Sequence, residues 1–178
     1  MADSILWSTP LDKPKLRELM LFALLGALTF GCKVVMMGLP NIEPVSLTVL
    51  LYGAVFGRKA LYPVYIYVML EFLLFGLNLW SINYLYIWAI LALLGWLLQG
   101  MDSALGWALA SGAYGLFFGL LCTPVYAVTG GLAFAVSWWI SGIPFDLIHG
   151  AANFVIAMIL FKPLRKTLEQ LYGKIRSL

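Results

Sequence analysis

Three polar side chains late in the sequence are spaced so that one helical face would carry all of them. Asp146, His149 and Asn153 stand at positions i, i+3 and i+7 of an otherwise apolar segment, and this spacing puts them on one side of a helix. An acid, an imidazole and an amide on one face can bind a polar ligand, whereas satisfied core residues are the structural alternative. We interpret the three together as one wall of a pocket, although for His149 alone a core role is the better interpretation.

Two further ionisable residues, Lys33 and Glu71, also lie within apolar segments. A charged group at the centre of a membrane costs at least about 2.5 kcal/mol on insertion scales, so each of these residues needs a partner or a function. An ion pair between them is one structural interpretation, and a Lys33 side chain that extends to the membrane surface is another. Direct contact with a ligand is the functional alternative.

Aromatic and amide residues cluster around residues 78–88, and Trp138 and Trp139 lie in the last outer loop. An aromatic belt at the membrane surface accounts for part of this cluster. Ring faces combined with a few amides would also suit a large, flat ligand. The predicted binding site consists of Asn41, Glu43, Glu71, Trp80, Asn83, Tyr84, Trp88, Asp146, His149 and Asn153.

No pattern typical of an enzyme is present. The chain has a single histidine, no Ser-His-Asp order and no phosphate-binding loop, so hydrolysis, metal chemistry and nucleotide binding are unsupported. Cys32 and Cys122 lie in apolar segments without metal-ligand spacing, and we interpret them as small core residues. We therefore predict a protein that is not an enzyme, with no metal site, no cofactor and no nucleic-acid partner.

The elements that must position these residues are membrane helices. No charged side chain occurs from Ser103 to Phe145, and 63% of the chain is hydrophobic while only 11% is charged, compared with about 25% charged in ordinary soluble domains. We predict an all-α integral membrane protein whose residues 1–178 form a single domain. A short segment, 1–15, precedes the helices, and a basic tail, 162–178, follows them.

Apolar runs between Gly, Pro and polar breaks predict about six transmembrane helices. Their expected ranges are 16–37, 45–56, 61–77, 84–98, 103–125 and 143–161. The second is short and follows an irregular loop, and residues 132–140 would form a separate half-helix near the membrane surface. Pro144 suits the first turn of the last helix, where Asp146 would complement the positive helix end.

The cations predict the orientation. Ten of the eleven Lys and Arg residues fall before or at the start of the first helix, between the second and third, or after the last. With six spans these places share one side, which the positive-inside rule assigns to the cytoplasm. Both termini are therefore expected in the cytoplasm, and the loops around Asn41 and Asn83 on the outside.

Small residues recur on the first predicted helix. Ala23 and Ala27 form a small-xxx-small pair that Gly31 continues, with Gly26 beside it. Such spacing lets a second helix approach closely, although alanines fill membrane helices for many reasons.

Taken in order along the chain, these motifs resemble a known family. The sequence Pro-Asn-Ile-Glu-Pro-Val at 40–45, the Ala23-x-x-x-Ala27 pair and Gly-Ile-Pro-Phe-Asp-Leu-Ile-His at 142–149, leading through Asn153 to Phe-Lys-Pro-Leu at 161–164, look like a substrate-binding S component of an energy-coupling factor (ECF) vitamin transporter. The resemblance covers nearly the whole chain. Among its branches, the chain is most similar to the cobalamin-type S components of lactobacilli.

The resemblance implies a small multi-pass protein of the cell membrane that captures a vitamin from outside and has no ATPase of its own. Its expected partners are a transmembrane coupling subunit and two cytoplasmic ATPase subunits, besides the lipid bilayer. Ala23, Ala27 and Gly31 would form the docking face. Cobalamin is the ligand that we predict, with riboflavin, folate, pantothenate and queuosine as alternatives. A membrane scaffold protein without transport, or a self-sufficient channel or carrier, is the remaining alternative.

Overall fold

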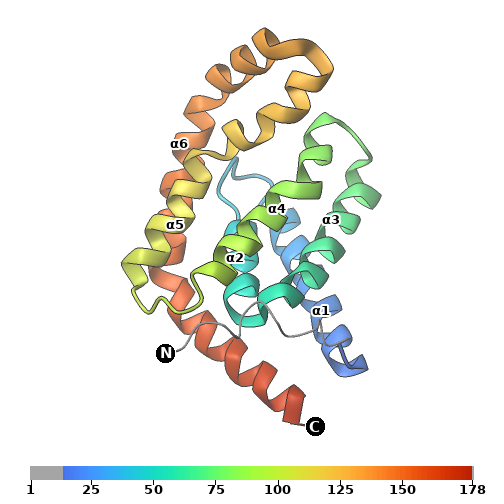
Figure 1. Cartoon of the computed structure of the whole chain (residues 1–178), viewed down its shortest axis with the longest axis vertical. Helices are drawn as coiled ribbons and strands as arrows, with labels where there is room; N and C mark the ends of the chain where they lie inside the picture. Colours follow the sequence, from blue (N-terminus) through green and yellow to red (C-terminus); the bar gives the residue numbers. More distant parts are fainter. Residues whose placement is uncertain (1–13, 178) are drawn as a thin grey trace.

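The computed structural model describes residues 14–177, and every regular element in that range is helical. The elements are α1 (Leu16–Val35), α2 (Val45–Phe56), the 3-10 turn η1 (Gly57–Ala60), α3 (Leu61–Phe75), α4 (Leu79–Leu97), α5 (Ala104–Leu116) and α6 (Phe118–Ser177). The predicted all-α fold is therefore confirmed for these residues. Figure 1 shows the helices as a bundle from which one end of the α5–α6 pair projects.

The short helix α2 lies at the centre of the bundle, and almost all its residues are buried. It crosses α4 closely because both helices carry glycine at the crossing. A Cβ atom on Gly53 would collide with the carbonyl of Ala92, and one on Gly95 would collide with the carbonyl of Leu50. Small residues at a helix crossing allow the two backbones to approach each other. These glycines thus hold α4 and its aromatic side chains against the core.

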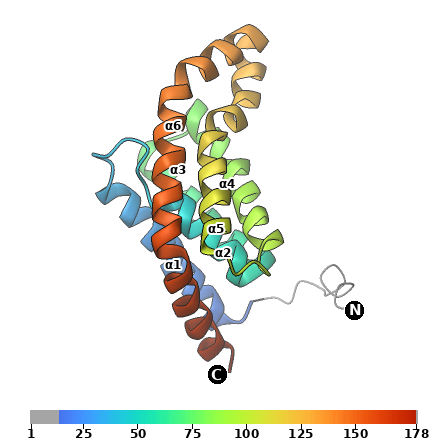
Figure 2. The ribbon, with the colours of Figure 1, turned by 90° about the vertical axis from the view of Figure 1, so that its left-hand side faces the viewer.

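Helix α6 is two helices joined at a sharp bend. Gly131 has φ 83° and ψ 167°, a backbone conformation that is open almost only to glycine. Before the bend, residues 118–130 follow α5 at an angle to it; after it, the chain returns alongside α5 and runs to Ser177 (Figures 1 and 2). Gly115 and Gly150 meet where α5 and α6 cross, since a Cβ on Gly115 would lie 2.8 Å from the backbone of Gly150.

Several predicted helix boundaries were wrong around this bend. Pro144 lies inside α6 rather than in a first turn, so there is no separate half-helix at 132–140, and the basic tail continues the same helix through Pro163. A proline kinks a helix without ending it when packing holds the neighbouring turns, as α5 does here. The fifth predicted helix is interrupted at Phe117. The fourth begins earlier than predicted, at Leu79, because Asn78 accepts hydrogen bonds from the backbone N–H groups of Trp80 and Ser81.

Three helices are long and apolar enough to cross a membrane: α1, α4 and the stretch Ala104–Ser177 that joins α5 and α6. With 12 and 15 residues, α2 and α3 are shorter than the roughly 20 residues that a full span needs. Large apolar side chains such as Leu24, Leu73 and Val128 are exposed on the surface of the bundle, as expected for contact with lipid.

At one end of the bundle, a buried carboxylate joins three cationic segments. Glu18 of α1 accepts hydrogen bonds from Lys59 of η1 at 2.9 and 3.1 Å and from the Tyr172 hydroxyl of α6 at 2.6 Å. The Tyr172 ring also packs edge-on against Phe56, with 4.8 Å between the ring centroids. The start of α1, η1 and the end of α6 therefore meet at the same end, which we call the basic end (Figure 1).

Candidate functional site

A cavity of about 220 Å³ lies at the opposite end of α1, beneath the loop of residues 36–44. We call it the loop cavity. Its walls come from α1, the loop, α4 and both parts of α6, and consist of Lys33, Met36, Met37, Leu39, Pro40, Asn41, Ile42, Glu43, Tyr84, Phe118 and His149. Four of the predicted binding residues line it: Asn41, Glu43, Tyr84 and His149. Because Asn41 has a φ of 59°, a conformation that asparagine tolerates better than most residues, it also shapes the loop.

The predicted ion pair between Lys33 and Glu71 forms beside this cavity. Lys33 Nζ lies 2.5 Å from Glu71 Oε2, and the side-chain exposures are 14% and 0%. Of these two residues, Lys33 lines the cavity and Glu71 does not. The Lys33 ammonium lies 4.8, 5.2 and 5.6 Å from the ring centroids of Phe75, Trp80 and Tyr84. Glu71 therefore lies behind Lys33 and away from the cavity, and its other oxygen has no hydrogen-bond partner among residues 14–177.

A second acid, Glu43, faces His149 across the loop cavity. His149 Nε2 is 3.9 Å from Glu43 Oε1 and 3.2 Å from the hydroxyl of Ser46, in the first turn of α2. Burial raises the pKa of Glu43 to about 7, an effect that the nearby Lys33 ammonium partly opposes and the Glu71 carboxylate reinforces. Glu43 thus changes charge close to neutral pH, inside a cavity that also holds an imidazole and an ammonium.

The predicted stripe on the last helix exists, but its members face different surroundings. Asp146, His149 and Asn153 are all buried, and only His149 reaches the cavity. Asp146 accepts the Gly119 N–H at 3.1 and 3.2 Å. Its carboxylate therefore complements the start of residues 118–130, so the prediction that it serves the first turn of its own helix was wrong. Asn153 packs against Gly115 of α5, and no described residue offers its Nδ2 a hydrogen bond.

The aromatic residues of α4 form a continuous stack. Tyr84 lies edge-on between Trp80 and Trp88, with ring centroids 5.2 and 5.3 Å away. Trp88 is fully buried beneath it, and its indole N–H has no hydrogen-bond partner in the part of the chain that the structure describes. Only Tyr84 of this stack lines the cavity. Asn83 lies outside it, since its side chain bonds the Leu79 carbonyl and the Tyr86 hydroxyl.

Sequence reasoning missed Met36, Met37 and Phe118 as cavity residues. The two methionines directly precede the predicted loop, and their flexible side chains suit a surface that adapts to a ligand. Phe118 packs edge-on against His149, 4.9 Å away. No local pattern indicated Phe118, because it reaches the cavity only through the break at Phe117 that redirects the chain.

The predicted docking face on α1 is exposed. Ala23, Ala27 and Gly31 all lie at the surface, and a Cβ on Gly31 would meet nothing within 4 Å. Gly26 instead faces α3, where a Cβ would lie 2.7 Å from the Pro63 carbonyl oxygen. One side of α1 thus packs inside the bundle, while its small-residue side is open to another helix.

Residues 14–177 contain no group of three or more His, Cys, Asp and Glu side chains arranged to hold a metal ion. Comparison with protein-family models, with curated proteins and with solved structures gave no match. The residues and their geometry therefore carry the functional argument.

Proposed function

We propose that this chain is the substrate-capturing membrane subunit of an ECF-type vitamin importer, as its sequence resemblance implies. The observation that carries the proposal is the loop cavity. It combines the Lys33 ammonium, the Glu43 and His149 pair and the ring of Tyr84 in one cavity at one end of an apolar bundle. A few converging polar groups within an apolar and aromatic wall are typical of small-molecule binding sites.

The proposed topology has six passages between the two faces of the cell membrane, of which α2 and α3 are too short to span it by themselves. The chain runs between the two ends of the bundle along α1, α2, α3, α4, α5 with residues 118–130, and the rest of α6. By the positive-inside rule the basic end faces the cytoplasm, together with both termini. The loop cavity then opens toward the outside, where a vitamin would be captured.

The size of the cavity bears on which vitamin is bound. Drug-sized ligands occupy sites of about 300 to 1,000 Å³, and the loop cavity has about 220 Å³. Cobalamin is much larger than a drug-sized molecule, so it would bind only after residues 36–44 had moved away. Riboflavin, pantothenate or another compact vitamin needs a smaller displacement, and we therefore place these vitamins ahead of cobalamin.

The exposed Ala23, Ala27 and Gly31 support docking to a coupling subunit. Residues 14–177 provide no nucleotide-binding loop, so energy would come from two ATPase subunits bound to that partner. Close approach of a partner helix needs small side chains on the facing surface, and α1 offers them along three successive turns.

Uptake by reconstituted vesicles tests this role. We expect the purified chain alone to bind a vitamin without accumulating it, and accumulation to need ATP and a complete coupling module. Accumulation by the chain alone would identify a self-sufficient carrier instead. Failure to bind any vitamin, with an intact fold, would favour a scaffold protein.

A further inference from the structure

A larger cavity, about 560 Å³ in volume, opens at the basic end between α6 and the loop that joins α4 to α5. We call it the basic cavity. Its lining consists of Gly100, Met101, Asp102, Trp107, Lys162, Pro163, Arg165, Lys166 and Glu169. Three cations and two carboxylates leave a net positive charge, and Met101, Trp107 and Pro163 supply an apolar floor. The vitamin-capture role uses none of these residues.

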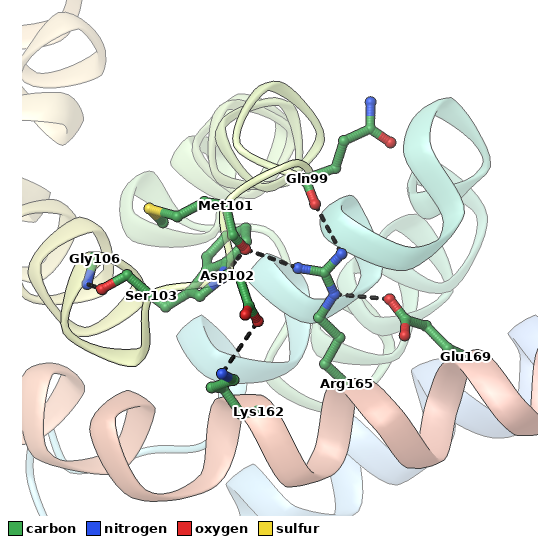
Figure 3. Close-up of polar contacts among 9 residues, drawn as sticks. Gln99, Met101, Asp102, Ser103, Gly106, Lys162, Arg165 and Glu169 are labelled. Carbon is green, nitrogen blue, oxygen red and sulfur yellow. Dashed lines mark hydrogen bonds and ion pairs between the residues drawn. The ribbon is translucent and has the colours of Figure 1, made fainter.

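Arg165 fixes the back of this cavity. Its guanidinium donates to the carbonyl oxygens of Gln99 at 2.7 Å and Met101 at 3.1 Å, and to the Glu169 carboxylate at 2.7 Å (Figure 3). The Trp107 indole N–H donates to the same Met101 carbonyl at 3.0 Å. These bonds hold the α4–α5 loop against α6, so the cavity is built before any ligand arrives.

The two lysines at the rim are available to an anion. Lys162 and Lys166 stand one helical turn apart, on either side of Arg165 in the sequence. Lys162 pairs with Asp102 at 3.1 Å, but the Asp102 side chain is 94% exposed, and such exposed pairs contribute little and are readily exchanged. Lys166 is exposed and makes no ion pair within residues 14–177.

The basic cavity lies where the surface of the bundle changes from apolar to charged. Leu97 and Leu105 flank the α4–α5 loop in the sequence, Ile159 and Leu160 precede Lys162, and all four side chains are exposed. Beyond them, the exposed surface of α6 carries lysines and Glu169. An apolar surface that ends at a rim of cations matches the boundary between acyl chains and headgroups.

We propose that the basic cavity binds the phosphate group of an anionic membrane lipid. Lys162 and Lys166 contact the phosphate, which displaces Asp102, while the glycerol and the first acyl carbons lie on Met101 and Trp107. Basic pockets at the cytoplasmic face of helical membrane proteins bind anionic headgroups in this way. The site would anchor the basic end in the inner leaflet, whichever ligand the loop cavity takes.

Native mass spectrometry of the detergent-purified full-length chain tests the proposal. The protein is titrated with phosphatidylglycerol and with phosphatidylcholine of the same acyl chains. We expect one molecule of phosphatidylglycerol to bind to the protein, more tightly than phosphatidylcholine does. Lys162→Gln with Lys166→Gln should weaken it about 30-fold, or about fivefold for each cation. The matched control is Lys174→Gln with Arg176→Gln, which removes the same charge from α6 outside the cavity and should leave this binding unchanged.

Each contrary outcome overturns the proposal. Equal binding of the two lipids would remove the preference for an anion, and equal losses in the two double variants would indicate general attraction to a basic helix. If inorganic phosphate or glycerol 3-phosphate alone binds as tightly as the lipid, the cavity is a site for a soluble phosphate. Thermal unfolding of each variant checks the fold, which these exposed lysines should not affect.

Discussion

Removing one member of the Lys33–Glu71 ion pair should destabilise the protein unequally, depending on which member is lost. In Lys33→Met, the Glu71 carboxyl has no exposed surface and loses its partner. Breaking a buried pair in this way costs about 3 to 5 kcal/mol. At about 2 to 4 °C per kcal/mol for a chain of this size, the thermal midpoint should fall by about 6 to 20 °C.

Glu71→Leu should reduce the stability of the protein by less than Lys33→Met does. The Lys33 ammonium keeps its contacts with the rings of Phe75, Trp80 and Tyr84, and each strong cation–π contact contributes about 0.5 to 2 kcal/mol. Lys33 is also partly exposed, so water can solvate it once its partner is gone. The double variant removes both charges and should regain most of the lost stability, since apolar replacement of a buried pair is often neutral.

Thermal unfolding in detergent, monitored by tryptophan fluorescence, measures all four proteins under identical conditions. The reasoning predicts a larger loss for Lys33→Met than for Glu71→Leu, and a double variant that is more stable than the worse single variant. It would be refuted by single losses that simply add in the double variant, or by a larger loss for Glu71→Leu. Ligand affinity in the same set would separate a structural pair from a ligand contact.

Other variants test single contacts elsewhere in the fold. Leucine at both Ala23 and Ala27 should abolish uptake by the complete transporter while ligand affinity stays at the parental value; parental uptake would place docking elsewhere. The folded pKa of Glu43, about 7, lies above its unfolded value. The wild type should therefore lose stability relative to Glu43→Gln as pH rises from about 4.5 to 7, by at most about 3 kcal/mol. A stability difference between the two proteins that does not vary with pH would contradict this. Gly119→Ala places a methyl group against the Asp146 carboxylate and should cost about 1 to 3 kcal/mol in denaturant unfolding, whereas Gly142→Ala, with no atom near its Cβ position, should change little.

The sequence predicted helices best where local signals bound them. Helix α2 has the range that was predicted, because Pro44 precedes it and Gly57, with a φ of 58°, follows it. The long α6 was misjudged because Pro144 and Pro163 normally favour boundaries, whereas packing along α5 keeps the helix continuous. Gly131 produces the decisive bend, yet it is one glycine among many in an apolar stretch. Local sequence patterns do not reveal which glycine adopts a positive φ.

Four of the ten predicted binding residues line the loop cavity, and the sequence did not predict how the helices bring them together. Helical spacing correctly placed His149 on a buried face with Asp146 and Asn153. It did not indicate that Asp146 would bond Gly119, because that contact depends on how residues 118–130 pack after the break at Phe117. Asn83 was misplaced for a similar reason, since its amide is satisfied within its own helix. Residues from separate helices meet at the loop cavity, and sequence spacing within one helix cannot predict such meetings.

Titration of the purified full-length chain with individual vitamins tests the central claim most directly. Riboflavin, folate, pantothenate, queuosine and cobalamin are each added to the protein in detergent, and binding is followed by isothermal calorimetry. We expect saturable binding of one of them at one molecule per chain, weakened at least several-fold by Tyr84→Ala or His149→Leu and unchanged by Trp139→Ala, since Trp139 lies outside the cavity lining. Binding of none of these vitamins by the folded chain, or binding that the cavity variants leave intact, would contradict it.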